Sequence, residues 1–132
     1  MILVDTSVWI DWLRAAATPA AALLERLLDE DMLALSAVTL QELLQGARNE
    51  GALGELDAHF SALTVLVPTL DTYRAAGALY ARCRWQGITP RSPHDCLIAQ
   101  TAIEHDVPLL CDDRDFQALA RVAGKLRLLS VK

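Results

Sequence analysis

Glycine, proline and cysteine are all scarce in this 132-residue sequence, with six, five and three residues respectively. A collagen-like or low-complexity chain would contain far more glycine and proline, and a largely disordered chain would contain fewer hydrophobic residues. Leucine and alanine, which are strong helix formers, supply 24 and 21 residues, and 53% of the chain is hydrophobic. The sequence therefore predicts one compact, helix-rich domain spanning residues 1–132.

Long apolar segments and a secretory leader are also absent. The longest stretch without a formal charge covers residues 58–70 and contains His59 and Pro68, whereas a membrane-spanning helix needs roughly 20 apolar residues. Met1 is followed directly by a short apolar run, without a basic leader segment. The three cysteines are odd in number and lack a paired metal-binding spacing. We expect no membrane association, a cytoplasmic location and reduced cysteines in the core.

Positive charge is scarce as well, with 12 Lys and Arg against 17 Asp and Glu and a net charge of -5. A chain of this balance does not hold nucleic acid through a general basic field. Local binding is still allowed, because arginines gather at Arg82, Arg84 and Arg91 and because carboxylates can hold phosphates through a divalent cation. These three arginines are the candidate contacts to RNA.

Short apolar runs alternate with helical patterns along the whole chain. Continuous apolar runs suit strands that are buried on both faces of a parallel sheet. The predicted strands are residues 2–4, 32–35, 64–67, 107–110 and 126–131. The predicted helices are residues 6–14, 19–31, 39–49, 53–63, 71–85, 93–105 and 115–122. This alternation predicts an α/β fold: a single three-layer domain in which a mainly parallel, twisted sheet of about five strands is flanked by helices.

Two aspartates stand at predicted helix starts. Asp5 follows the first predicted strand, and its position fits a helix N-cap as well as a functional role. Asp95 follows Ser92 and Pro93, which are typical of a helix start, yet it heads an apolar stripe that continues with Ile98. A buried charge is retained only when it is paired, hydrogen-bonded or bound to a metal. We therefore favour a functional role for Asp95.

Glu42 has a different context. Residues 39–42 match a capping box, in which the glutamate reaches back to the cap residue. The apolar stripe that includes Leu40, Leu43 and Leu44 leaves Glu42 on another face of the helix. The pattern alone indicates a solvated or capping side chain.

Three further acids, Asp112, Asp113 and Asp115, follow the fourth predicted strand. One of them caps the next helix, and the others would lie beside Asp5 if the sheet has the usual doubly wound order. Two carboxylates about 4 Å apart repel by roughly 4 kcal/mol at an effective dielectric near 20, so a converging cluster must take up protons, waters or a cation. Oxygen ligands favour Mg²⁺ or Mn²⁺ over zinc. Of the three histidines, only His94 is placed near this cluster.

The sequence resembles the PIN-domain ribonucleases, and within them the VapC-type toxins of bacterial toxin–antitoxin pairs. Four segments carry the resemblance and occur in the family's order: residues 2–11, 39–46, 91–99 and 109–116. The resemblance implies that the catalytic and metal-binding acids are Asp5, Glu42, Asp95 and Asp113. It implies supporting roles for Thr6, Ser7, Asp112 and Asp115. Glu42 is therefore counted as functional on resemblance, and Asp113 is less secure than Asp5 because Cys111 and Asp112 depart from the family's pattern.

The resemblance also implies a reaction and partners. The expected reaction is Mg²⁺-dependent hydrolysis of an RNA phosphodiester, with Mn²⁺ able to substitute, in which metal-activated water attacks phosphorus and leaves a 5′-phosphate and a 3′-hydroxyl. The expected partners are the RNA substrate, a small cognate antitoxin of the VapB type and a second copy of the chain in a homodimer.

Two rival functions are weaker. Another Mg²⁺-dependent phosphoryl hydrolase on a doubly wound sheet, similar to the haloacid dehalogenases, would need a second aspartate at the position of Ser7. A catalytically silent PIN-like binding module would be expected to have lost some of the acids, whereas every expected position is filled here. The sequence therefore favours the ribonuclease toxin.

Overall fold

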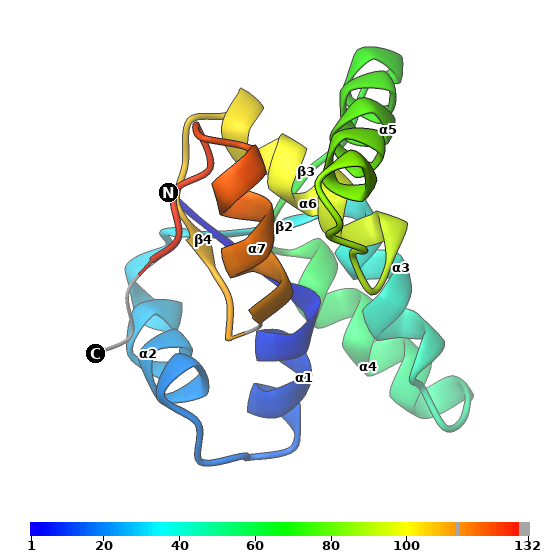
Figure 1. The fold of residues 1–132 in the computed structure, drawn as a ribbon. Helices are drawn as coiled ribbons and strands as arrows, with labels where there is room; N and C mark the ends of the chain where they lie inside the picture. The colour runs from blue at the N-terminus through cyan, green and yellow to red at the C-terminus, as the bar shows by residue number, and fades with distance from the viewer. Residues whose placement is uncertain (113, 130–132) are drawn as a thin grey trace.

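The structure is a computed structural model that describes residues 1–112 and 114–129. Its elements in chain order are β1 (Ile2–Val4), α1 (Thr6–Leu13), α2 (Pro19–Leu27), a 3-10 helix η1 (Leu28–Glu30), β2 (Leu33–Ser36), α3 (Ala37–Gln45), α4 (Glu50–Ser61), β3 (Thr64–Leu66), α5 (Leu70–Trp85), α6 (Pro93–Glu104), β4 (Leu109–Leu110) and α7 (Arg114–Val122). Figure 1 shows this alternation of short strands and helices along the chain.

The four strands form one parallel sheet in the order β3-β2-β1-β4. Val4 of β1 is in register with Leu110 of β4, so the ends of these two strands lie side by side, as the doubly wound order predicts. The α/β fold with a parallel sheet is confirmed, but the predicted fifth strand over residues 126–131 is not formed in the described part of the chain. There, Leu128 makes only an isolated parallel bridge to Leu109.

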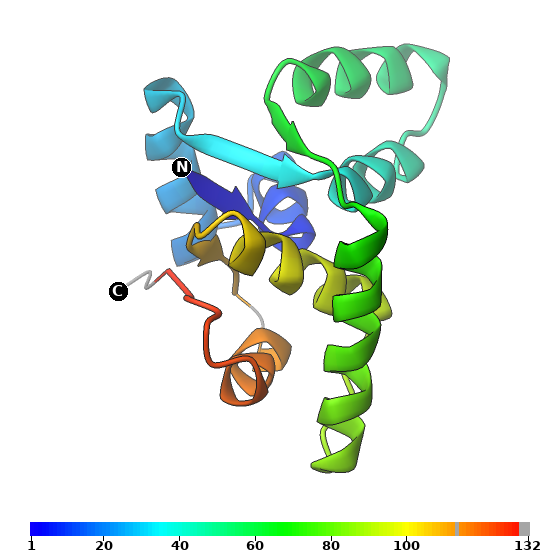
Figure 2. The same cartoon turned by 90° about the horizontal axis from the view of Figure 1, so that it is seen from above.

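Helices cover both faces of the sheet, because successive side chains of each strand point to opposite faces. Ile2 and Val4 pack with residues of α1, α2 and α4, whereas Leu3 packs with residues of α5, α6 and α7. Figure 2 shows the latter three helices together on one side of the strands. The predicted three-layer arrangement is therefore present.

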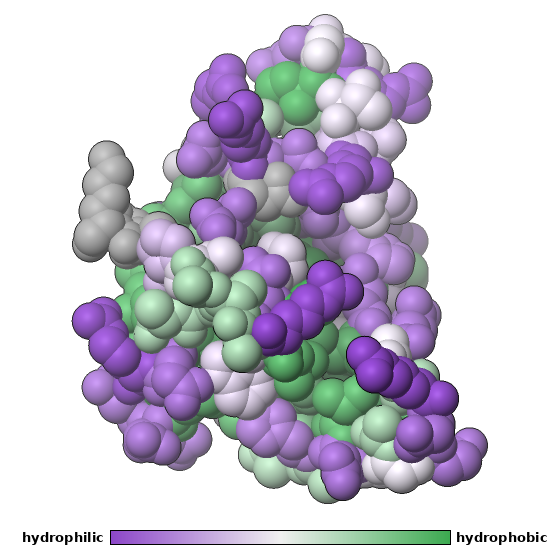
Figure 3. Space-filling view, turned by 90° about the horizontal axis from the view of Figure 1, so that it is seen from below, coloured by the Kyte–Doolittle hydropathy of each residue, from purple (hydrophilic) through white to green (hydrophobic). Residues whose placement is uncertain are grey.

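The layer that contains α1 and α4 leaves a groove at its surface. The groove has a volume of about 390 Å³ and is lined chiefly by α1, α4 and the end of α3, with Trp12, Leu13, Ala47, Ala52 and Leu56 as its apolar part. Figure 3 shows hydrophobic residues gathered in a hollowed area on this face, bordered by hydrophilic ones. Beneath it, the buried rings of Trp9 and Phe60 pack edge to face with centroids 5.1 Å apart.

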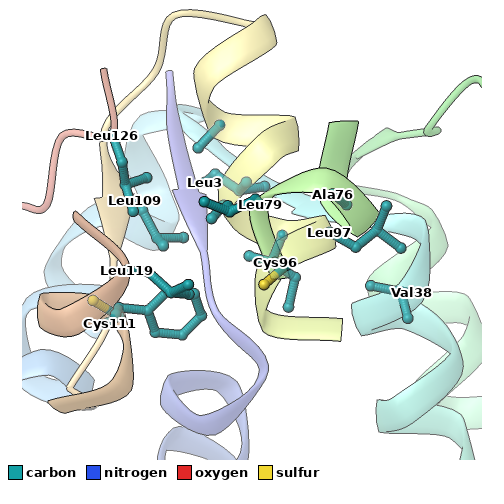
Figure 4. Packing of buried hydrophobic residues seen from close by; sticks show 14 of the residues in the cluster. Leu3, Val38, Ala76, Leu79, Cys96, Leu97, Leu109, Cys111, Leu119 and Leu126 are labelled. Atoms are coloured by element: carbon teal, nitrogen blue, oxygen red, sulfur yellow. The ribbon is translucent and has the colours of Figure 1, made fainter. Parts of the chain in front are cut away.

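The opposite layer is closed by the second half of the chain. Figure 4 shows Leu3 and Leu109 of the sheet meeting side chains of the helices, among them Leu79, Leu97 and Leu119. All three cysteines lie in this core as free thiols, as the sequence predicts. Among residues 1–112 and 114–129, no helix is long and apolar enough to cross a membrane.

The start of α3 differs from the sequence prediction. Its N-cap is Ser36, the last residue of β2, whose hydroxyl accepts a hydrogen bond from the Val38 amide. The helix therefore begins two residues earlier than predicted, and Thr39 lies inside its first turn. The predicted capping box over residues 39–42 is wrong, because a serine at the strand end already satisfies the exposed amides of the helix.

Candidate active site

Asp5 lies at the carboxyl end of β1, where it also caps α1. Its carboxylate Oδ2 accepts hydrogen bonds from the Ser7 amide at 3.3 Å and the Ser7 hydroxyl at 2.5 Å. Only 4% of the residue is exposed. The N-cap role and a functional role therefore coexist, because the bonds that cap the helix also fix the carboxylate at the end of the sheet.

Three side chains connect α1 to α3. The Thr6 hydroxyl donates to Glu42 Oε1 at 2.9 Å and lies 2.9 Å from the Thr39 hydroxyl oxygen. Thr6 has one hydroxyl proton, and because Glu42 takes it, Thr39 must donate its own to Thr6. We call this set of Thr39, Thr6 and Glu42 the hydroxyl chain.

The hydroxyl chain corrects the reading of Glu42 as a solvated or capping side chain. Glu42 is only half-buried, but it turns toward α1 rather than back to the start of its own helix. Thr39 precedes it by one helical turn, so both side chains face Thr6. Sequence reasoning missed Thr39, and the signal available was Ser36, a good cap directly after a buried strand.

α6 brings His94 and Asp95 to the same end of the sheet. The helix begins as predicted, with Ser92 as N-cap accepting from the His94 amide at 3.1 Å. His94 Nδ1 lies 3.7 Å from Glu42 Oε2, and the neighbouring Asp95 is half-buried. Burial raises the pKa of the adjacent Cys96 thiol to about 12, and Cys83 and Asp95 add to the rise.

A pocket of about 560 Å³ opens beside Ser7. It is lined by acids and arginines from α1, the loop before α6 and the region between β4 and α7, namely Ser7, Asp11, Arg91, Asp112, Arg114 and Asp115. Arg91 Nε contacts Asp115 Oδ2 at 3.1 Å and ties the loop before α6 to α7. Asp112 is exposed at this pocket.

Most of the predicted site residues therefore meet at one edge of the sheet. Asp5, Ser7, Thr6 and Glu42 are linked by hydrogen bonds, and Asp95 lies next to His94, which faces Glu42. Two predicted RNA contacts, Arg82 and Arg84, are instead exposed in the last turn of α5 and do not line the pocket. Asp113, the fourth predicted metal ligand, lies outside the described residues. Asp11 and Arg114 were not predicted and line the pocket.

The donor chemistry of this edge suits a hard divalent cation. Asp5, Glu42 and Asp95 offer carboxylate oxygens, and the cysteines are buried in the core. Within residues 1–112 and 114–129, no group of three or more His, Cys, Asp or Glu side chains is arranged to hold a metal ion. Mg²⁺ does not need such a cage, because it keeps several waters and takes one or two carboxylates from a protein.

Comparison with known proteins identifies the family. The PIN domain model matches residues 2–122. The chain belongs to the PIN-domain family. Within it, the chain is 37% identical over 127 residues to ribonuclease VapC11 of Mycobacterium tuberculosis, an alignment that covers 94% of this chain and 95% of the relative. It is 38% identical over 112 residues to ribonuclease VapC19 of the same species, covering 83% and 86%.

Solved structures show the same PIN fold. The chain matches the structure of DNA-bound VapBC from Salmonella typhimurium with a TM-score of 0.76 and 24% identity, covering 99% of this chain and 98% of the other. It matches VapBC2 from Rickettsia felis, bound to a promoter DNA fragment, with a TM-score of 0.75 and 23% identity, covering 98% of each chain. The predicted family and fold class are confirmed, and the predicted ribonuclease function agrees with the names of the VapC relatives.

Proposed function

We propose that this chain is the toxin of a toxin–antitoxin pair, an endoribonuclease that uses Mg²⁺ or Mn²⁺ and acts in the cytoplasm. The observation that carries the proposal is the meeting of Asp5, Glu42 and the start of α6 at the carboxyl end of a parallel sheet. Ligands of open α/β sheets bind at this end. The full-length similarity to VapC ribonucleases supports the same activity.

The cation would be held by Asp5, Glu42 and Asp95, with Asp113 as the further predicted ligand. A divalent cation lowers the pKa of a coordinated water and offsets charge on the phosphate and the leaving oxygen. The chain's own groups position these ligands: Ser7 orients Asp5, and Thr6 holds Oε1 of Glu42. Such support for ligand side chains keeps their geometry fixed before substrate arrives.

Arg91 and Arg114 are the groups at the pocket that suit an RNA backbone. Guanidinium groups bind phosphate oxygens through paired N–H donors. Asp115 orients Arg91 through its carboxylate, and both arginines are exposed at the pocket. We propose that the RNA strand enters the site along this pocket.

The apolar groove between α1 and α4 supports the antitoxin part of the proposal. A hydrophobic hollow with a charged border, here Arg48, Glu55 and His59, is typical of a surface that receives an amphipathic peptide. The VapBC titles describe toxin–antitoxin complexes of related folds. We propose a VapB-type antitoxin as the partner, and pairing of two copies of this chain stays a prediction.

The nuclease proposal is tested by mutation of the acids. Purified wild type, Asp5→Asn, Glu42→Gln and Asp95→Asn are incubated with unstructured RNA in Mg²⁺, Mn²⁺ or EDTA. The control is Asp29→Asn, which removes an exposed carboxylate of η1, and thermal melting verifies that each variant is folded. We expect cleavage by wild type and the control in either metal, and a loss of at least about a hundredfold in the site variants, as for other removed catalytic groups.

The products give a second readout. Attack by water leaves a 5′-phosphate and a 3′-hydroxyl, whereas attack by the ribose 2′-hydroxyl would leave a cyclic phosphate. Cleavage that persists in EDTA, or in folded Asp95→Asn protein, would overturn the metal-dependent mechanism. The absence of any cleavage of RNA by the wild type would favour a silent binding module.

A further inference from the structure

Trp85 is the most exposed large hydrophobic side chain in the described part of the molecule. It is the last residue of α5, and 79% of it is open to solvent. Among the described residues it packs against no other aromatic ring and makes no hydrogen bond. Figure 2 shows the carboxyl-terminal end of α5 extending past the rest of the molecule. An indole in this position contributes nothing to the core.

Positive charge surrounds this indole. Arg82 and Arg84 lie in the same last turn, and both are exposed. No described residue forms an ion pair with either of them, in contrast to Arg74, which pairs with Asp71 at the other end of α5. Arg82 and Trp85 are three residues apart, so they lie on the same side of the helix.

The whole segment around the indole is free of acids. Residues 72–94 contain four arginines and no aspartate or glutamate, although the chain as a whole carries a charge of -5. This basic segment ends directly before Asp95. Its loop, residues 86–92, contains Arg91, which lines the pocket beside Ser7. The segment therefore runs from the tip of α5 to the candidate active site.

We propose that Trp85 is a stacking platform for a base of single-stranded RNA, with Arg82 and Arg84 contacting the adjoining phosphates. Aromatic rings within a basic surface bind single strands in this way, because every base has a face that stacks. The proposal rests on the proposed ribonuclease function and adds a contact outside the reacting centre. Trp85 is a positioning residue, and it acts on substrate affinity rather than on the chemical step.

Binding is measured in the Asp95→Asn background, so that RNA stays intact, by anisotropy of a labelled 12-nucleotide oligoadenylate. An abasic ribose-phosphate oligomer of equal length serves as the second probe. Trp85→Ala should weaken oligoadenylate binding by about 5- to 100-fold, the range of one lost stacking contact. It should leave the abasic oligomer unaffected, and Trp85→Phe should restore most of the affinity. The matched control is Tyr73→Ala, an exposed aromatic in the first turn of the same helix, which should change neither affinity.

The arginines are tested by salt dependence. The double variant Arg82→Ala/Arg84→Ala should weaken both probes and reduce the slope of log affinity against log salt by about two, one for each lost phosphate contact. Arg74→Ala should leave the slope unchanged. In the active protein, Trp85→Ala should raise KM for cleavage with kcat nearly unchanged.

Three results would overturn the platform. One is equal oligoadenylate affinity of Trp85→Ala and its parent, and another is an equal loss on the abasic oligomer. The third is an altered oligomeric state of Trp85→Ala with unchanged RNA affinity, which would assign the indole to a protein interface. If wild type binds RNA through Trp85 but cleaves none, the nuclease proposal fails and the platform stands. If cleavage needs Asp95 while Trp85→Ala changes neither affinity nor KM, the platform fails and the nuclease stands.

Discussion

The hydroxyl chain should couple the stabilities of α1 and α3. Thr39 is fully buried, and its hydroxyl proton goes to Thr6, whose own proton goes to Glu42. Thr39→Val removes one hydrogen bond and should lower the free energy of unfolding by about 1 kcal/mol. Thr6→Val also leaves the Thr39 hydroxyl buried without its acceptor, which costs about 1–3 kcal/mol, so its total loss should be about 2–3 kcal/mol.

The double variant separates this account from simple packing. With both hydroxyls replaced by methyl groups, no buried donor is left unpaired, so Thr6→Val/Thr39→Val should lose less than the two single losses combined, by about 1 kcal/mol. Urea unfolding in EDTA measures the effect, and a loss of 2 kcal/mol lowers the midpoint by about 1 M for a slope near 2 kcal/mol per M.

Thr101→Val supplies the matched control. Thr101 is equally buried, but its hydroxyl donates to the Leu97 carbonyl within its own helix. The pair Thr6→Val/Thr101→Val should therefore be additive. Additive losses for Thr6 and Thr39 as well would refute the hydroxyl chain, because they would mean that Thr39 turns to a backbone carbonyl of the preceding turn when Thr6 is lost.

Two further predictions concern metal and alkaline pH. Mn²⁺ at ten times its Kd should stabilise the wild type and the Asp29→Asn control by about 1.4 kcal/mol, a rise of a few degrees in Tm, and should stabilise Asp95→Asn less; equal shifts in all three proteins would exclude Asp95 as a ligand. The pKa of the Cys96 thiol is about 12 in the folded protein and about 8.5 when unfolded, so above pH 9 the folded state holds a proton that the unfolded state has lost. Stability should then fall by about 1.4 kcal/mol per pH unit through this group, and urea unfolding at pH 8, 9 and 10 should show a shallower fall in Cys96→Ala; an equal slope would refute the assignment.

The parallel sheet was predictable because its strands are buried on both faces. Apolar runs such as residues 2–4 carry no polar residue, and the alternation of such runs with helices admits few topologies. The last strand was overpredicted for the same reason. Residues 126–129 are apolar enough for a strand, yet only Leu128 forms a bridge to β4, because an apolar run does not specify how many backbone pairs it makes.

The candidate site was only partly predictable from helix patterns. Asp5 and Asp95 follow recognisable start signals, so their positions at the sheet edge follow from the fold. The position of Glu42 did not, because the pattern over residues 39–42 favours a cap that Ser36 already provides. Two competing caps three residues apart rotate the predicted faces of the helix by almost a full turn. The contact that decides between them, from Thr6, comes from a distant part of the chain.

The donors that hold each acid indicate different tasks within the site. Asp5 and Glu42 are held by hydroxyls of Ser7 and Thr6, which are neutral, so both carboxylates keep their full charge available to a cation. Asp115 is held by Arg91, which already offsets its charge. The hydroxyl-bonded acids therefore suit metal binding, whereas the arginine-bonded acid suits the orientation of a phosphate-binding side chain. One edge of the sheet thus carries a cation-binding part and an anion-binding part side by side, which is the arrangement that cleavage of a phosphodiester requires.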